Sequence, residues 1–137
     1  MENLFVTYNL SLTLKELGFD EPCWAWYHIA DQDIRYCYSD QRSPIKNSEE
    51  EWYAKNENRE IEIICIPTYS QAFRWFRDKN YEVYYSKKED GTITFRVEYG
   101  HWDFISDESF LDYEKAESVC LKKLIEINII QNQSRQK

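Results

Sequence analysis

The hairpin pattern over residues 81–99 constrains the fold of this chain more than any other feature. A two-residue loop at Asp90-Gly91 would place Tyr85 opposite Arg96 and so mix core and solvent sides, whereas the three-residue loop 89–91 pairs apolar with apolar residues. The longer loop also puts Gly91 at the left-handed position of a type I turn with a glycine bulge. The predicted cross-strand pairs are Tyr81 with Tyr99, Val83 with Val97 and Tyr85 with Phe95.

Apolar residues at helical spacing predict three helices. They run from Leu10 to Leu17, from Tyr69 to Phe76 and from Tyr113 to about residue 131. The first helix ends at Gly18, which suits a left-handed C-terminal cap. Thr68 or Ser70 caps the start of the second helix, and Asp112 caps the third.

Further strands are predicted on the N-terminal side of the central helix. The stretches 23–29 and 34–38 are rich in strand-forming residues and flank a polar turn, which indicates an antiparallel hairpin. Apolar residues alternate with glutamates over residues 60–65, which predicts a short strand ending at Pro67. The segment 39–59 between these strands has little periodicity and is predicted to be a long loop with a short helix at residues 49–55.

The element order is therefore α-β-β-loop-β-α-β-β-α. This order predicts an α+β fold in which a mainly antiparallel sheet of about five strands is covered on one face by three helices. The length of 137 residues suits one hydrophobic core. We expect a single domain over residues 1–131, followed by a polar, frayed tail at 132–137.

Charge and composition limit the classes of partner that this chain is expected to bind. Acidic residues outnumber basic ones by 25 to 17, giving a formal charge of −8, so direct binding to a nucleic-acid backbone is not expected. The chain also has 23 aromatic residues, counting five Trp, eleven Tyr and seven Phe. Many Tyr and Trp side chains are typical of strand surfaces or of protein interfaces.

The N-terminal residues and the four cysteines indicate a cytoplasmic protein. The first residues lack the basic, apolar and small-residue regions of a secretory signal, and no apolar run is long enough to span a membrane. Four free thiols are expected in a reducing compartment, and no pair has the C-x-x-C spacing of common zinc sites. We therefore expect no cofactor and no metal.

Three segments resemble a family of short, uncharacterised proteins of phages, prophages and mobile elements from Bacteroides-type bacteria. They are Leu14-Lys-Glu-Leu-Gly-Phe-Asp-Glu-Pro-Cys23, Phe73-Arg-Trp-Phe-Arg-Asp-Lys79 and Tyr113-Glu-Lys-Ala-Glu-Ser-Val-Cys-Leu-Lys-Lys-Leu-Ile-Glu126. The resemblance covers both ends and the central helix. It implies an origin but no catalytic residues, because no activity is established for the family. The same segments also read as fold determinants, namely a capped helix with its exit turn and two amphipathic helices.

Catalytic motifs are weak in this sequence. Cys23 and His28 are the one sequence-close pair of nucleophile and base, and their odd spacing puts them on opposite faces of a regular strand. His101 follows Gly100 at a strand end near acids, a position that is more often structural. No glycine-rich phosphate loop is present. The sequence predicts a protein that is not an enzyme.

Acidic residues gather at two places. Asp31 and Asp33 lie in the first hairpin turn, where they are most simply part of a solvated rim. The segment 101–117 carries six acids, and Trp102 and Phe104 lie among them. Charge complementarity would attract such a segment to a basic surface.

The leading hypothesis is a phage or mobile-element accessory protein that binds a host or phage protein with a basic surface. Its most concrete version is an anti-CRISPR-type inhibitor of a nucleic-acid-handling protein. The alternative is a small-ligand module or enzyme with a pocket lined by tryptophans 24, 26, 75 or 102. The oligomeric state is open. The predicted partner-binding residues are Trp102, Asp103, Asp107, Glu108, Trp24 and Trp26.

Overall fold

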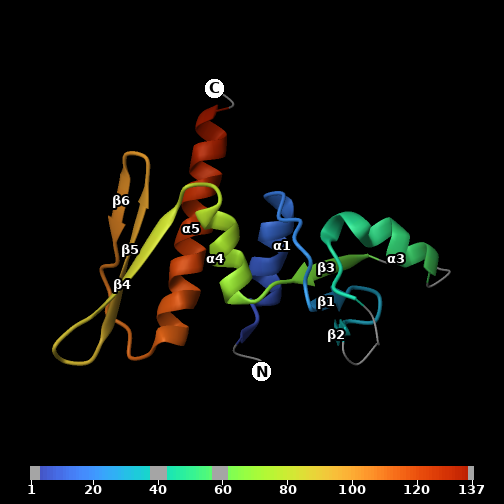
Figure 1. Cartoon of the computed structure of the whole chain (residues 1–137), viewed down its shortest axis with the longest axis horizontal. Helices are drawn as coiled ribbons and strands as arrows, with labels where there is room; N and C mark the ends of the chain where they lie inside the picture. Colours follow the sequence, from blue (N-terminus) through green and yellow to red (C-terminus); the bar gives the residue numbers. More distant parts are fainter. Residues whose placement is uncertain (1–3, 38–42, 57–61, 136–137) are drawn as a thin grey trace. The chain divides into compact units, whose positions relative to one another are not determined.

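The computed structural model describes residues 4–37, 43–56 and 62–135, and the chain divides into two compact units, Met1–Gln71 and Ala72–Lys137. Each unit holds one three-stranded antiparallel sheet with helices beside it, so the fold class is α+β (Figure 1). The prediction of a single sheet of about five strands is wrong, because the described residues form six strands in two sheets. Strands β1, β2 and β3 of the first sheet belong to the first unit, and strands β4, β5 and β6 of the second sheet belong to the second unit.

The first unit contains a sheet of order β2-β1-β3, in which both neighbours run antiparallel to the central strand β1. The predicted first hairpin is confirmed by the pairing of β1 with β2. The end of the second predicted strand at residue 38 lies outside the described residues. The elements are α1 (Tyr8–Glu16), β1 (Ala25–His28), β2 (Asp33–Tyr36), the 3-10 helix η2 (Asn47–Glu49), α3 (Glu50–Asn56) and β3 (Ile63–Ile66).

Helix α1 has the glycine cap that the sequence predicts. Gly18 has a φ of 97°, the Gly18 amide donates to the Lys15 carbonyl, and the Phe19 amide donates to the Leu14 carbonyl at 2.9 Å. These two bonds are the paired contacts of a Schellman motif. They end the helix and direct Phe19, which is fully buried, into the core of the first unit.

Strand β3 is more deeply buried than its alternating pattern predicts. All four of its residues are buried, because β3 packs against α1 and pairs with the central strand β1. Side chains of the preceding segment also satisfy its backbone: Glu50 accepts from the Ile63 amide and Asn47 accepts from the Cys65 amide, both at 2.9 Å. Ile61, which the sequence assigned to this strand, lies outside the described residues.

The predicted loop 39–59 is partly regular in its described portion, residues 43–56. Ile45 exchanges backbone hydrogen bonds with Cys23, at 2.8 and 3.1 Å, and η2 and α3 follow. The short helix predicted at 49–55 is confirmed by α3. Its first residue, Glu50, also accepts a hydrogen bond from the Lys15 ammonium at 2.9 Å and so ties this segment to α1.

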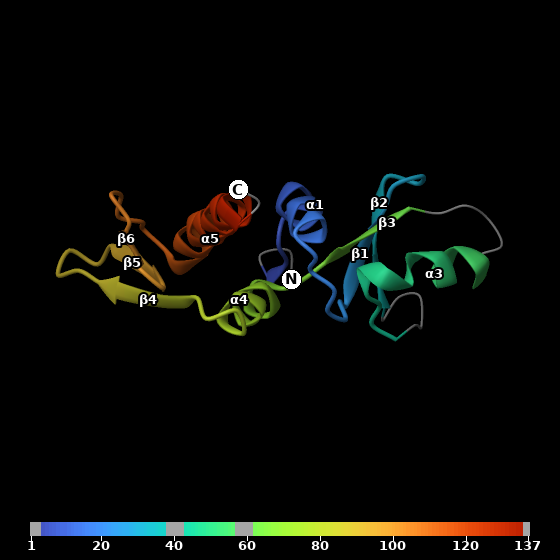
Figure 2. The ribbon, with the colours of Figure 1, turned by 90° about the horizontal axis from the view of Figure 1, so that it is seen from above.

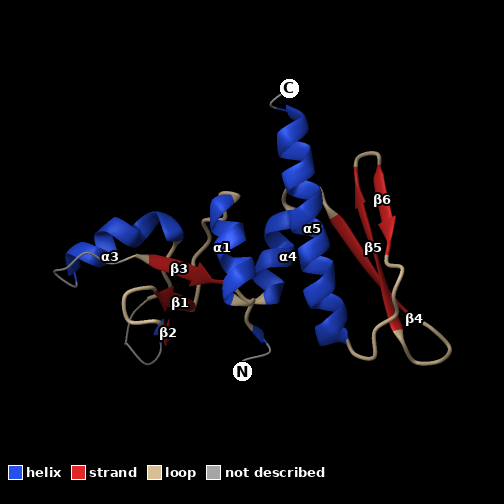
Figure 3. Ribbon diagram, turned by 180° about the vertical axis from the view of Figure 1, so that it is seen from behind, coloured by secondary structure: helices blue, strands red, loops and turns tan. Residues whose placement is uncertain are grey.

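The second unit consists of the sheet β4-β5-β6 and the long helix α5, which runs beside the sheet in both views of the ribbon (Figures 1 and 2). Helix α4 begins in the first unit and continues into the second. Figure 3 separates the helices from the strands by colour. The elements are α4 (Tyr69–Arg77), β4 (Glu82–Lys87), β5 (Ile93–Tyr99), β6 (Trp102–Ile105) and α5 (Tyr113–Arg135).

The register predicted for the 81–99 hairpin is confirmed. Val83 pairs with Val97 and Tyr85 with Phe95, while the Lys88 amide donates to the Thr92 carbonyl and leaves a three-residue loop. Gly91 has a φ of 90°, as the glycine bulge requires. The rings of Tyr81 and Tyr99 stack with their centroids 4.0 Å apart.

Strand β6 is not predicted from the sequence, which assigns its residues to an acidic surface. It pairs with β5 after a turn of Gly100 and His101, in which Gly100 has a φ of 56°. Its pattern of Trp, Phe and Ile around one acid is a short strand signal. The two-residue turn was the feature that could have identified it.

Helices α4 and α5 begin at the predicted caps. Thr68 and Gln71 form a capping box, and the Lys115 amide donates to Asp112 at 2.8 Å. Helix α5 continues to Arg135, four residues beyond its predicted end, so residues 132–135 of the expected tail are helical. Its buried residues include Ala116, Cys120, Leu121, Leu124, Ile125 and Ile127.

No helix in the described residues is both long and apolar enough to cross a membrane.

Candidate functional site

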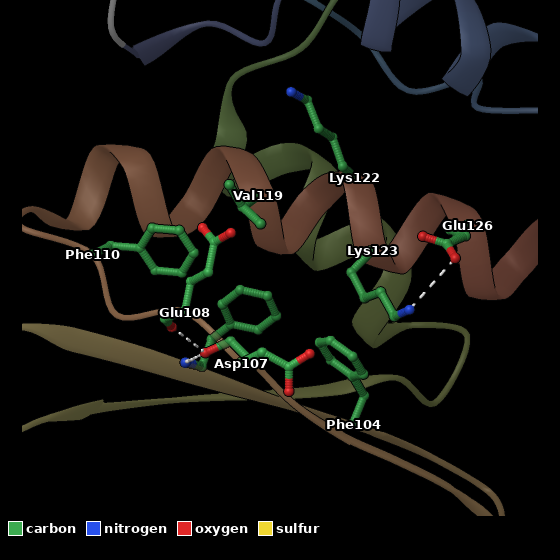
Figure 4. A pocket seen from close by; sticks show the side chains of 10 residues that line it. Phe104, Asp107, Glu108, Phe110, Val119, Lys122, Lys123 and Glu126 are labelled. Atoms are coloured by element: carbon green, nitrogen blue, oxygen red, sulfur yellow. Dashed lines mark hydrogen bonds and ion pairs between the residues drawn. The ribbon is translucent and has the colours of Figure 1, made fainter.

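The second unit contains a pocket of about 240 Å³ between the β6–α5 connection and helix α5 (Figure 4). Its apolar lining comes from three phenylalanines and one valine on different elements. The Phe95 ring stacks on the Phe110 ring and tilts toward the Phe104 ring, with centroids 6.0 Å apart in each pair. The residues of this lining are Phe95, Phe104, Phe110 and Val119.

Two backbone anchors fix the segment that carries the acidic rim. Ser106 donates its amide to the Phe95 carbonyl at 2.9 Å and accepts from the Phe95 amide through its hydroxyl at 3.1 Å. Phe110 exchanges two backbone hydrogen bonds of 2.8 Å with Ile93. The residues between these anchors, Asp107 and Glu108 among them, are exposed at the mouth of the pocket.

The opposite wall of the pocket carries basic residues of α5. The Lys123 ammonium lies 4.2 Å from the centre of the Phe104 ring and 3.5 Å from a Glu126 carboxylate oxygen. Its positive charge is therefore partly neutralised by neighbouring groups of the same wall. Lys122 extends away from the ring cluster in Figure 4. The pocket therefore has an aromatic floor, an acidic rim on one side and a partly compensated basic wall on the other.

The structure separates the predicted partner-binding residues of the acidic segment 101–117. Asp103 lies opposite Glu98 on the outer face, where it binds the Arg96 guanidinium through two hydrogen bonds of 2.8 Å. Trp102 lies opposite Tyr99, is 39% exposed and alternates with Asp103 in direction. Asp107 and Glu108 line the pocket, so the predicted acids do not form one surface.

The two predicted tryptophans of the first unit differ in burial. Trp24 is 55% exposed, whereas Trp26 is fully buried in the central strand β1. Trp26 is therefore a core residue, and its ring is not presented on the surface. The pocket is also lined by phenylalanines rather than by tryptophans 24, 26, 75 or 102.

The cysteines are all buried and free of disulfides. The Cys23 thiol donates to the Glu21 carbonyl and the Cys65 thiol to the Ile45 carbonyl, each at 3.4 Å. A hydrogen bond with Cys23 and burial raise the pKa of Cys65, and burial raises the pKa of Cys120 to about 12. Cys65 and Cys120 are therefore protonated at neutral pH, which makes them poor nucleophiles.

One group of side chains in the described residues has the composition of a metal-binding site. His28, Asp31 and Asp33 each place one possible ligand atom within 4.8 Å of the others. From the sequence, His28 is considered only as a base for Cys23, and the two aspartates are interpreted as part of a solvated rim. The turn between β1 and β2 brings the three together, and the spacing H-x-x-D-x-D on a hairpin was the signal that sequence reasoning missed.

Comparison with protein-family models, curated proteins and solved structures gave no match to this chain.

Proposed function

We propose that this protein is a non-catalytic binding protein whose target is a basic segment of another protein. One apolar side chain of that segment occupies the phenylalanine-floored pocket, and neighbouring Lys or Arg side chains pair with the rim. The observation that carries the proposal is the position of Asp107 and Glu108, which are held at the mouth of the pocket by the anchors at Ser106 and Phe110. A pre-organised rim of this kind lowers the entropy cost of binding.

The size of the pocket favours a side chain over a larger free ligand. Its volume of about 240 Å³ is below the range of roughly 300–1,000 Å³ that is usual for drug-sized molecules. A floor of three aromatic rings suits the apolar anchor residues that dominate the binding energy of protein interfaces. Exposed apolar residues on the same unit, Ile105 and Leu111, extend the surface available to a partner.

Charge supports a basic partner. Lys123 already contacts Glu126 and the Phe104 ring, whereas Asp107 and Glu108 form no ion pair with another described residue. A positively charged segment would find its complement at these two carboxylates. Such complementarity raises the association rate and makes it sensitive to salt.

The resemblance to phage and mobile-element proteins suggests that the partner is a host protein. A host protein that handles nucleic acid offers the Lys- and Arg-rich surface that an acidic rim fits. An inhibitor that covers such a surface in the host cytoplasm, as an anti-CRISPR-type protein would, is the concrete form of the proposal.

Selection of a random displayed peptide library on the immobilised full chain tests the proposal. We expect enriched peptides to combine one large apolar residue with nearby Lys or Arg, because the pocket and its rim recognise these two features. Affinity should fall by about tenfold or more in the double variant Asp107→Lys/Glu108→Lys. Association of the original protein should slow as salt is raised.

The matched control is Asp78→Lys/Glu89→Lys, which makes the same charge change at exposed positions away from the pocket lining. This control should bind the selected peptides as the original does. Peptides that bind the rim variant and the original equally would overturn the proposal. Selected peptides without basic residues would overturn the assigned partner chemistry.

A further inference from the structure

The end of the β1–β2 hairpin gathers one imidazole and two carboxylates. His28 is the last residue of β1 and lies directly opposite Asp33, the first residue of β2. The turn between them, residues 29–32, is closed by a hydrogen bond from the Gln32 amide to the Ile29 carbonyl. It brings an Asp31 carboxylate oxygen to 3.4 Å from His28 Nδ1.

Burial divides this group into a fixed side and an accessible side. The His28 side chain is fully buried, so the packed core of the first unit determines where its ring lies. The side chains of Asp31 and Asp33 are 32% and 54% exposed. A cation arriving from solvent would meet the carboxylates first and the imidazole behind them.

The charge of the first unit favours a cation. Residues 1–71 contain 13 acidic and six basic side chains, a formal charge of −7, whereas residues 72–137 contain 12 and 11, a formal charge of −1. Nearly all of the excess negative charge of the protein therefore belongs to the unit that contains His28. A summed negative potential raises the local concentration of cations.

The donor set has the chemistry of a transition-metal site. Imidazole nitrogen and carboxylate oxygen bind Zn²⁺ at roughly 2.0–2.2 Å, and Mn²⁺ and Fe²⁺ accept the same mixture. Donor atoms that already lie within 4.8 Å of one another need only a small contraction to surround one ion. Three protein ligands would leave at least one coordination position for water.

Arg35 forms ion pairs with both carboxylates. Its Nη2 donates to an Asp31 oxygen at 2.5 Å, and its Nε lies 3.4 Å from an Asp33 oxygen. The guanidinium neutralises two acids that would otherwise repel each other at this separation. A bound divalent ion would take over that role and displace Arg35 from the carboxylates.

We propose that His28, Asp31 and Asp33 form a binding site for a divalent transition-metal ion, with Arg35 as the counter-ion of the metal-free protein. The site belongs to the first unit, whereas the proposed peptide-binding pocket belongs to the second. The competing interpretation is an ion-pair network that closes the hairpin and binds no metal. The two interpretations differ in the effect of removing Arg35.

Isothermal titration of the chelator-treated full chain with Zn²⁺ alone tests the site. We expect saturable binding of one ion per chain. Asp33→Asn should weaken that binding by roughly tenfold or more, because a neutral amide replaces the negatively charged carboxylate ligand. Arg35→Gln should tighten it, since the competing cation is lost. The thermal midpoint should rise with Zn²⁺ in the original protein and rise less in Asp33→Asn.

The matched control is Glu16→Gln, which removes one exposed carboxylate from α1 of the same unit and should leave the affinity for Zn²⁺ unchanged. Asp33 is used in preference to buried His28 because its replacement leaves the core intact, and circular dichroism checks the fold of each variant. The absence of Zn²⁺ binding would overturn the proposal. Binding that Asp33→Asn does not weaken, or that Arg35→Gln does not tighten, would equally overturn it.

Discussion

Single residues in this protein act mostly through the backbone that they hold in place. Asp90 accepts hydrogen bonds from the Thr92 hydroxyl at 2.6 Å and from the Thr92 amide at 2.9 Å, and so closes the turn of the confirmed hairpin. Ser106 does the same for the rim of the pocket through its bonds with Phe95. In both cases a short polar side chain satisfies backbone groups that a bend leaves unpaired.

The pH dependence of the Asp90 turn is a direct consequence of these bonds. The Thr92 hydroxyl, and next the Thr92 amide, lower the pKa of Asp90 below its ordinary value of 3.8. A depressed folded-state pKa means that the stabilisation is present above the unfolded value and is lost as the pH falls through the lower folded value. We expect an NMR titration of the Asp90 carboxyl to give a pKa below 3.8.

The control for this titration is Thr92→Val, which removes the hydroxyl donor and keeps the shape of the side chain. The pKa of Asp90 should rise toward its ordinary value in this variant. An Asp90 carboxyl that titrates identically in both proteins would show that the hydroxyl bond is absent in solution.

At the scale of elements, local signals set several of the helix ends. Gly18 ends α1, Thr68 and Gln71 begin α4, and Asn80, with a φ of 74°, ends the turn after α4. The exception is α5, which continues to Arg135. Its last residues are polar, but none of them is a glycine or proline that would stop a helix.

The N-cap of α5 gives a testable energy. Asp112→Ala removes the acceptor of the Lys115 amide, and we expect it to lower the free energy of unfolding by about 1 kcal/mol. Urea denaturation measures this difference. Asp112→Asn is the control, because asparagine is an equally good cap, and it should lose much less stability. Equal losses in the two variants would assign the effect to charge instead of capping.

At the scale of the whole molecule, the chain forms two compact units, while the sequence predicts one domain over residues 1–131. Helix α4 spans the division, so the two units are joined by helical backbone and not by a polar linker. Unfolding of either unit would therefore disrupt part of α4, which also belongs to the other unit. That the chain unfolds as a single domain therefore stays a prediction, and the shared helix α4 is its physical reason.

Native-state hydrogen exchange measures whether the two units unfold together. We expect the slowest amides of β1 and β3 and those of β5 and α5 to exchange with one common free energy, because opening of either unit disrupts α4. Amides of regular, buried strands report global unfolding in this experiment. Two well-separated values, one for each sheet, would show instead that the units unfold independently.

Burial of the thiols makes a second prediction for the whole chain. All four cysteines are buried and free, so we expect a thiol reagent to react slowly with the native protein and to count four thiols after denaturation without reductant. Denatured protein that shows two thiols or fewer would contradict the reduced state. Rapid reaction of the native protein would contradict the burial.

Sequence by itself determined the features that depend on near neighbours. The register of the 81–99 hairpin follows from apolar pairing and from Gly91, and the helix caps follow from side chains within one turn of the backbone they satisfy. Such local preferences act before distant parts of the chain meet. The antiparallel pairing of both predicted hairpins was determined in the same way.

Only the tertiary structure decided the features that depend on distant neighbours. Strand β3 returns to pair with β1, which separates the strands into two sheets and buries Trp26, and β6 turns Asp103 away from Asp107 and Glu108. The phenylalanine pocket needs side chains from β5, β6 and α5 together. Residues at similar positions in a pattern can thus end on opposite faces or at different depths, because each orientation is set by what packs against it across the fold.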